Sequence, residues 1–326
     1  MIPRIGVIGR QSPDDFADNI CDSLTAMGIA NVRLGWPQIS KQYSGLDALL
    51  DVARRSVRVE EFLQRSLVRR ASEHECTAIL TVEEKTSPHA VRQLRENGLP
   101  VALWFPDAVA NLGRLQCVLA PYTVMFFKDK GLADRLRATL GVPAHYLPEA
   151  CNDRWHRSSQ PQGVEPVIVV AGNLYSSRVR VVERLHDAGL PLVLYGGRPP
   201  RWLSSHSVRQ LHTGTYLARQ EKADVFRRAA AVLNNLHPGE VDGVNCRLFE
   251  AAGSGAVVLA ERRAVMQELF AEDELLPWGT FDELVHQAKA AVDARGGCAA
   301  VGDRAARRAH RDHTYEQRLA VILQHF

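Results

Sequence analysis

The sequence contains no apolar run of about 18 residues, the length that a membrane-spanning helix needs. Its six cysteines include no C-x-x-C pair, and none stands at zinc-site spacing from a histidine. Neither a membrane span nor a structural zinc site is therefore expected. The opening stretch, MIPRIGVIGRQ, has an apolar run too short for a signal peptide and is predicted to be a strand. A reducing, cytoplasmic location is the expectation that follows.

Dense basic runs interleaved with aromatic residues are also missing. The 326 residues carry a formal net charge of +3 with 24% charged residues, and most of the basic residues are arginine. A nucleic-acid partner is therefore not expected. The glycines after the first expected strand do not form G-x-G-x-x-G, the fingerprint of dinucleotide-binding enzymes, so an oxidoreductase is disfavoured as well.

What the sequence does have is a repeated alternation of short apolar runs and helical periodicity. Its length fits two domains of about 150 residues each. The expected strands are 4–10, 31–35, 77–83, 101–105, 124–127, 145–147, 166–171, 192–195, 232–236, 256–260 and 275–278. The expected helices are 13–28, 44–72, 87–98, 131–141, 176–189, 219–230, 264–270, 282–294 and 303–326. Such alternation predicts an α/β protein with two Rossmann-like sheets.

The division between the two domains is expected where periodicity fails. The segment WHRSSQPQGVE is rich in serine, glutamine, proline and glycine, which favours a linker. The predicted organisation is an N-terminal Rossmann-like domain at 1–155, a linker at 156–165, a C-terminal Rossmann-like domain at 166–305 and a closing helix at 306–326.

The most informative stretch is 237–263, HPGEVDGVNCRLFEAAGSGAVVLAERR. A polar loop follows an apolar strand and leads into a short helix, which is where α/β sheets present ligand-binding groups. The loop offers Asp242, the flexible Gly243 and Asn245, followed by N–H groups at a helix start. These groups suit sugar hydroxyls and a diphosphate. On loop chemistry alone, an ordinary loop with a capping aspartate and a turn glycine fits equally well.

This stretch resembles the donor-binding signature of GT-B glycosyltransferases of the group 1 type. That signature has two glutamates eight positions apart, a glycine soon after the first and an alanine after the second. Here Asp242 stands eight positions before Glu250, Gly243 follows Asp242, and Ala251 follows Glu250. The wording DGVNCRLFEAAGSGAVVLAE is closest to the CgeB-like (spore maturation protein) branch. Aspartate in place of the first glutamate shortens that acid by one methylene.

Other segments extend the resemblance. VALWFPDA and HYLPEACNDRWH resemble the N-terminal half of CgeB-like proteins, and HTYEQRLAVIL resembles their closing helix. The resemblance therefore implies a GT-B fold, in which two Rossmann-like domains face each other across a cleft. It also implies that the C-terminal helix crosses back onto the N-terminal domain.

The family holds the donor diphosphate with two cations near the start of the second domain. Arg178 lies at the position of the family lysine, six residues after Gly172, and an arginine can contact two phosphate oxygens at once. The second family cation, an arginine directly after that glycine, is replaced by Asn173. The remaining donor-binding positions implied by the resemblance are Gly196, Tyr216, Gly243, Val244, Asn245 and Arg247.

The implied reaction moves a sugar from a nucleotide diphosphate sugar to an acceptor hydroxyl, with retention of the anomeric configuration. Glu250 would hold ribose hydroxyls, and Asp242 would orient the donor sugar. No cofactor and no fixed metal are implied, because GT-B members lack the Asp-x-Asp metal motif, which is also missing here. Asp107, at the end of the strand at 101–105, is either a helix cap or an acceptor-side group. The implied partners are the nucleotide sugar and a hydroxyl acceptor on a glycan, a lipid-linked molecule or a protein.

Other functions stay open at this point. A GT-B-shaped sugar-nucleotide epimerase would use the same diphosphate site. The departures at Asp242 and Asn173 favour a sugar-nucleotide-binding protein without catalytic activity. A protein-interaction scaffold that binds no nucleotide is the third alternative.

Overall fold

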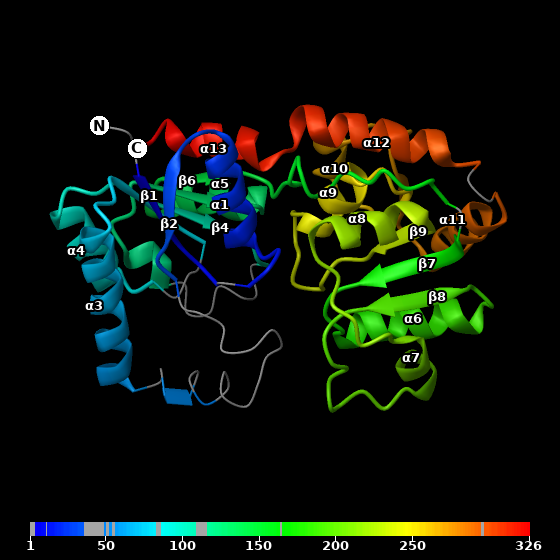
Figure 1. The fold of residues 1–326 in the computed structure, drawn as a ribbon. Coiled ribbons are helices and arrows are strands. Elements are labelled where there is room, and N and C mark those ends of the chain that lie inside the picture. Colours follow the sequence, from blue (N-terminus) through cyan, green and yellow to red (C-terminus); the bar gives the residue numbers. More distant parts are fainter. Residues whose placement is uncertain are drawn as a thin grey trace. The chain divides into compact units, whose positions relative to one another are not determined.

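The computed structural model describes residues 4–10, 12–35, 49, 52–53, 56–82, 86–108, 116–163, 165–294 and 297–326. The chain divides into two compact units, each built on a parallel sheet with helices packed against it (Figure 1). The first unit comprises Met1–Pro148 and Tyr315–Phe326, and the second comprises Glu149–Thr314. The predicted α/β class with two parallel sheets is confirmed.

The first unit has a six-stranded parallel sheet with the order β2-β1-β3-β4-β5-β6. Its strands are β1 (Arg4–Ile8), β2 (Ala30–Arg33), β3 (Ala78–Thr81), β4 (Val101–Phe105), β5 (Val124–Phe127) and β6 (Ala144–Tyr146). Its helices are α1 (Phe16–Ala26), α3 (Val57–Glu73), α4 (Pro88–Glu96), the 3₁₀ turn η2 (Gln116–Leu119), α5 (Lys130–Leu140) and α13 (Tyr315–Leu323). Strands β3 and β4 are buried at every residue, as expected for strands covered on both faces. Much of the first part of the predicted helix 44–72 lies outside the described residues; α3 confirms the rest.

Two helix starts show well-formed caps. The Ser87 hydroxyl accepts from the N–H of Ala90 at 3.1 Å, with proline in the first helical turn of α4. In the second unit, Thr280 and Glu283 form a reciprocal capping box at the start of α11. Hydrogen bonds from backbone N–H groups of the cap lower the pKa of the Glu283 carboxyl.

The predicted start of the first helix is wrong by three residues. Helix α1 begins at Phe16 instead of Pro13, and its cap is Asp15. The Asp15 carboxylate accepts from the N–H of Asp18 at 2.7 Å. The N–H and the hydroxyl of Ser12 both donate to Asp15 at 2.9 Å. Ser12 therefore supports the cap because a carboxylate is the stronger acceptor at a helix start.

The second unit has a five-stranded parallel sheet with the order β11-β10-β9-β7-β8. Its strands are β7 (Glu165–Ala171), β8 (Leu192–Tyr195), β9 (Ala229–Asn234), β10 (Val258–Glu261) and β11 (Leu276–Trp278). Its helices are α6 (Ser176–Asp187), α7 (His206–Leu211), α8 (Arg219–Arg228), α9 (Cys246–Gly253), α10 (Met266–Leu269), α11 (Phe281–Asp293) and α12 (Ala299–Asp312). Among the described helices, none is both long enough and apolar enough to cross a membrane.

The prediction placed the start of the central strand three residues too late. Ala229 and Ala231, assigned to a helix or its end, pair instead with β7 and belong to β9. Alanine has the highest intrinsic helix propensity, but here its small side chain fits a fully buried strand, and tertiary packing decides. The predicted C-terminal helix 303–326 is likewise two helices, α12 and α13, separated at His313, whose carbonyl accepts from the N–H of Cys151 at 2.9 Å.

The segment 156–163, predicted to be a linker, lies in the second unit and contacts α8. The Ser158 hydroxyl donates to the Asp224 carboxylate at 2.8 Å, and the N–H of Gly163 donates to the carbonyl of Arg227 at 3.1 Å. These bonds hold an irregular segment against a helix and satisfy polar groups that secondary structure leaves unpaired.

Strand order defines a switch point in the second sheet. Strand β7 pairs with β8 on one side and with β9 on the other. The chain therefore runs from β7 to β8 in one direction along the sheet and continues from β9 to β10 in the opposite direction. The loops that follow β7 and β9 diverge at the carboxyl ends of these strands. In open α/β sheets such a point is where ligands bind.

The last helix, α13, completes the core of the first unit. Phe16, Trp104 and Tyr315 pack edge to face, with ring centroids 4.5, 5.5 and 5.9 Å apart. The indole of Trp104 donates to the carbonyl of Leu147 at 3.3 Å. Because these rings come from α1, β4 and α13, they join the start and the end of the chain in one core.

Replacement of Tyr315, which is 1% exposed, by alanine should lower the free energy of unfolding of the first unit by about 3–5 kcal/mol. Val321→Ala on the exposed side of the same helix is the control, with an expected loss of about 0.5 kcal/mol or less. Chemical denaturation followed by tryptophan fluorescence measures both. Equal losses in the two variants would show that Tyr315 is not part of this core.

Candidate functional site

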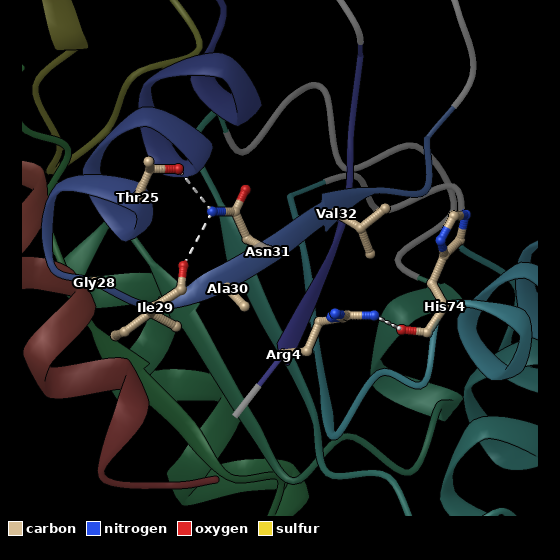
Figure 2. Close-up of a pocket in the computed structure, with 8 residues that line it drawn as sticks. All are labelled: Arg4, Thr25, Gly28, Ile29, Ala30, Asn31, Val32 and His74. Carbon is tan, nitrogen blue, oxygen red and sulfur yellow. Dashed lines mark hydrogen bonds between the residues drawn. The ribbon is translucent and has the colours of Figure 1, made fainter. Parts of the chain in front are cut away.

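A surface hollow of about 650 Å³ lies in the first unit at the amino ends of β1 and β2 (Figure 2). The Arg4 guanidinium donates to the carbonyl of His74 at 3.0 Å. The Asn31 amide donates to the Thr25 hydroxyl at 3.0 Å and to the Ile29 carbonyl at 3.2 Å. The polar groups of this hollow thus bond to one another, and the hollow lies at the sheet edge opposite to the carboxyl ends, where α/β sites gather.

A buried arginine, Arg178 in the first turn of α6, lies at the carboxyl edge of the second sheet. Its Nη1 donates to the carbonyl of Asn173, which follows β7, at 2.7 Å. Its Nε donates to Oδ1 of Asn235, which follows β9, at 2.9 Å. Its Nη2 donates to the Tyr175 hydroxyl at 2.9 Å. The guanidinium therefore lies at the switch point and joins both diverging loops.

Two cations converge at this point. Arg178 is 3% exposed, and burial, together with the nearby charge of Arg247, lowers its pKa to about 10. It still carries its charge at neutral pH. A Cβ at Gly172 would overlap Nη2 of Arg247 and would lie 3.4 Å from Nη1 of Arg178, so both guanidiniums lie against this glycine. Among the described residues, neither arginine has a carboxylate partner. Buried positive charge without an acid is an anion-binding arrangement.

Two glycines let the backbone approach closely here. Gly172 has φ +106°, a conformation that favours glycine. A Cβ at Gly196 would lie 2.8 Å from the carbonyl oxygen of Gly172. The loops after β7 and β8 thus meet without side chains between them.

The start of α9 adds further donors. Asn245 is its N-cap residue but makes no side-chain cap bond, and the carbonyl of Asn245 accepts from the N–H of Leu248 at 3.1 Å. The N–H groups of Cys246 and Arg247 belong to the helix start, where backbone donors lack intrahelical partners and the helix dipole is positive. Oδ1 of Asn245 is buried and has no hydrogen-bond partner in the part of the chain that the structure describes. Burial, followed by the charge of Glu250, raises the pKa of the Cys246 thiol.

Glu250 lies one turn further along α9 and forms an ion pair. Its Oε1 is 2.8 Å from Nζ of Lys222 in α8, and the two side chains are 8% and 9% exposed. The prediction that Glu250 binds ribose stays a prediction. Its pairing with Lys222 was not foreseen, because a single lysine in an arginine-rich helix carries no pattern.

Two further groups flank Gly196. The ring of His212 lies beside this glycine, and burial lowers the pKa of His212. Its Nδ1 accepts from the N–H of Gly214 at 3.0 Å, so the neutral ring carries its proton on Nε2. Tyr216 follows and is 52% exposed. Its predicted place beside a base stays a prediction.

The remaining predicted residues are more dispersed. Asp242 is half-buried in the loop between β9 and α9, where Gly243 and Val244 are buried. Asp107 belongs to the first unit; it is exposed directly after β4 and accepts from the N–H of Ala108 at 2.8 Å. Their predicted roles toward donor and acceptor stay predictions.

Sequence reasoning missed Tyr175 and Asn235, which hold Arg178. A signal for Asn235 was present, because two asparagines end the apolar run VLNN and polar residues at a strand's carboxyl end mark ligand sites. Extending the predicted strand to Leu236 hid it. Tyr175 is the N-cap residue of α6 and has no recognisable capping signature.

Comparison with solved structures finds likenesses over the whole chain. Sucrose-phosphate synthase from Thermosynechococcus elongatus is 12% identical, with a TM-score of 0.70, and the match covers 99% of this chain and 98% of that one. HepE from Anabaena, in complex with UDP and glucose, is 13% identical, with a TM-score of 0.63 and coverage of 99% and 100%. The trehalose-phosphate synthase (UDP-forming) from Burkholderia vietnamiensis is 13% identical, with a TM-score of 0.63 and coverage of 100% and 99%. The chain therefore has the GT-B fold, and that prediction is confirmed.

A family model agrees for the C-terminal part. Residues 178–324 match the model described as glycosyl transferase-like. The matched range begins at Arg178 and includes Asp242, Arg247 and Glu250. No curated protein matches the sequence. The narrower resemblance to the CgeB-like branch stays a prediction.

Replacement of Gly172 by alanine tests the close approach at this site. The added Cβ would occupy the place of the Arg247 guanidinium in a backbone conformation that alanine rarely adopts. We expect the free energy of unfolding to fall by about 1–3 kcal/mol. Gly197→Ala is the matched control, since nothing lies within 4 Å of its Cβ position. Chemical denaturation compares the two, and equal effects would contradict the packing described.

Proposed function

We propose that this chain is a glycosyltransferase that moves a sugar from a nucleotide diphosphate sugar to an acceptor hydroxyl. The observation that carries the proposal is the convergence of Arg178 and Arg247 on Gly172, with no carboxylate partner for either among the described residues. The family match over 178–324 and the GT-B fold support the same conclusion.

A diphosphate fits the distribution of charge at this site. It brings adjacent negative oxygens, and two guanidiniums with a helix start offer donors to them. Asn173 stands where the group 1 pattern has a cation. Arg247, whose guanidinium lies against Gly172, would supply that second cation from α9 instead. The Asn173 position keeps a structural role, because its carbonyl holds Arg178.

In the proposed reaction, the bond between the anomeric carbon and the β-phosphate oxygen breaks. A new bond forms between the anomeric carbon and the acceptor oxygen, and the acceptor's proton passes to the leaving phosphate. Negative charge grows on that phosphate, where Arg178, Arg247 and the first N–H groups of α9 would stabilise it. We propose that this set replaces a fixed metal and that the anomeric configuration is retained.

The other parts of the donor would meet the remaining residues of this edge. Glu250 would accept hydrogen bonds from ribose hydroxyls, Asp242 from the donor sugar, and the base would lie near Gly196 and Tyr216. Asp107 would serve the acceptor. HepE from Anabaena has been crystallised with UDP and with UDP-glucose, so uridine nucleotides are the first donors to examine.

Binding of a sugar nucleotide without transfer is the second candidate. It is favoured by Asp242, where the group 1 pattern has the longer glutamate. Release of free nucleoside diphosphate that depends on an added acceptor separates transfer from binding alone, and also from an epimerase.

Thermal denaturation with a panel of UDP, GDP, TDP and ADP and their sugars tests the donor site. A ligand that binds only the folded protein adds about 2.7 kcal/mol of stability at a hundredfold its dissociation constant. We expect a clear rise in Tm with one base. No rise with any of them at millimolar concentration, in folded protein, would refute the donor site and favour an interaction scaffold.

Arg247→Gln tests the phosphate assignment separately. Loss of a charge-assisted contact should weaken UDP binding by about 1.5–3 kcal/mol, which is about 10- to 100-fold. Uridine, which has no phosphate, should bind the variant and the wild type alike. Arg262→Gln, an exposed arginine after β10, is the control and should leave UDP binding unchanged. Isothermal calorimetry measures these affinities, and unchanged UDP binding by Arg247→Gln would remove Arg247 from the site.

A further inference from the structure

A buried ion pair beside the candidate donor site has no role in the proposed reaction so far. It joins Lys222 in the first turn of α8 to Glu250 in α9, with 2.8 Å between Nζ and Oε1. We propose that Lys222 is a positioning residue, which holds Oε1 of Glu250 and directs the other carboxylate oxygen, Oε2, to the ribose hydroxyls of the donor. This inference rests on the proposed function.

Burial makes the pair interdependent. The two side chains are 9% and 8% exposed, so each charge has lost most of its water. A buried carboxylate without a partner takes up a proton or distorts its surroundings. The Lys222 ammonium supplies that partner, and a carboxylate only accepts hydrogen bonds. It is therefore suited to ligand hydroxyls and unsuited to phosphate.

The pair also distinguishes the two carboxylate oxygens. Oε1 is occupied by Lys222, and within the described ranges no other hydrogen bond to the Glu250 carboxylate is found. Oε2 is thus the oxygen left for a ligand. Because α8 and α9 belong to one packed unit, Lys222 fixes the orientation of Glu250 before any ligand arrives.

A neighbouring histidine does not balance this charge. A ring nitrogen of His156 and a carboxylate oxygen of Glu250 lie within 4.8 Å of one another. Nδ1 of His156 accepts from the N–H of Asn152 at 2.8 Å, so this ring nitrogen is bonded to the backbone and not to Glu250. The cation in contact with Glu250 is therefore Lys222.

If Lys222 positions Glu250, its removal should affect only the binding of the ribose of the nucleotide. Removal of Lys222 should weaken recognition of the ribose hydroxyls and leave the phosphate contacts of Arg178 and Arg247 in place. The discriminating quantity is the affinity for UDP divided by the affinity for 2′,3′-dideoxy-UDP, which lacks those hydroxyls. Loss of general stability would change both affinities together and would leave this ratio unchanged.

The experiment measures UDP, 2′,3′-dideoxy-UDP and pyrophosphate binding by calorimetry in the wild type and in Lys222→Met. We expect the wild type to prefer UDP by about tenfold or more. In the variant the preference should fall to about twofold or less, with pyrophosphate affinity unchanged. Arg227→Met is the matched control: it removes an ion pair to Asp303 from the same helix and should keep the full preference.

A second variant guards against loss of fold. Lys222→Gln has an amide that can donate to the same oxygen without charge, so its preference for UDP should be intermediate. Full preference in either folded variant, or failure of both to fold cooperatively, would overturn the positioning role. A wild type that binds none of the nucleotides would refute the proposed function itself. A wild type that binds UDP and the dideoxy analogue equally would refute the ribose role of Glu250, and with it this inference.

Discussion

The buried guanidinium of Arg178 is the constraint on which the candidate site depends. A cation removed from water is tolerated only where its N–H groups find acceptors, so the carbonyl of Asn173, the hydroxyl of Tyr175 and Asn235 must hold their places. These acceptors lie on the loops that diverge from β7 and β9. The hydrogen bonds that satisfy the Arg178 cation therefore also hold these two loops in fixed positions relative to each other. In the proposed function, an anion would then bind with little rearrangement of the loops.

Helix α9 carries side chains of opposite charge, Arg247 and Glu250, within one turn. Arg247 extends toward Gly172, while Glu250 turns toward Lys222, so the helix presents a cation and a compensated anion to different neighbours. Within the described part of the chain the two arginines have no acidic partner, whereas the glutamate is paired with Lys222. In the proposed function, this difference assigns Arg247 to the phosphates and Glu250 to hydroxyl groups, although both lie on the same short helix.

Much of the fold could be predicted from the sequence, because its strands are short, apolar and buried on both faces. The strands at 101–105, 124–127 and 192–195 were placed with their observed bounds. The start of β9 was misplaced because its alanines favour helix when considered alone. Within the candidate site, spacing singled out Arg178 and Glu250, whose roles toward the donor stay predictions. Lys222 could not be found this way, since its contact with Glu250 exists only once α8 and α9 pack.

The placement of α13 has a consequence for synthesis. The chain leaves the first unit after Pro148 and re-enters it only at Tyr315, so the whole second unit is made between the two parts of the first. During synthesis, the aromatic cluster of Phe16 and Trp104 lacks its third ring until Tyr315 has left the ribosome. The unit that begins first is therefore the one that finishes last, and during translation its exposed apolar surface is what a chaperone would encounter.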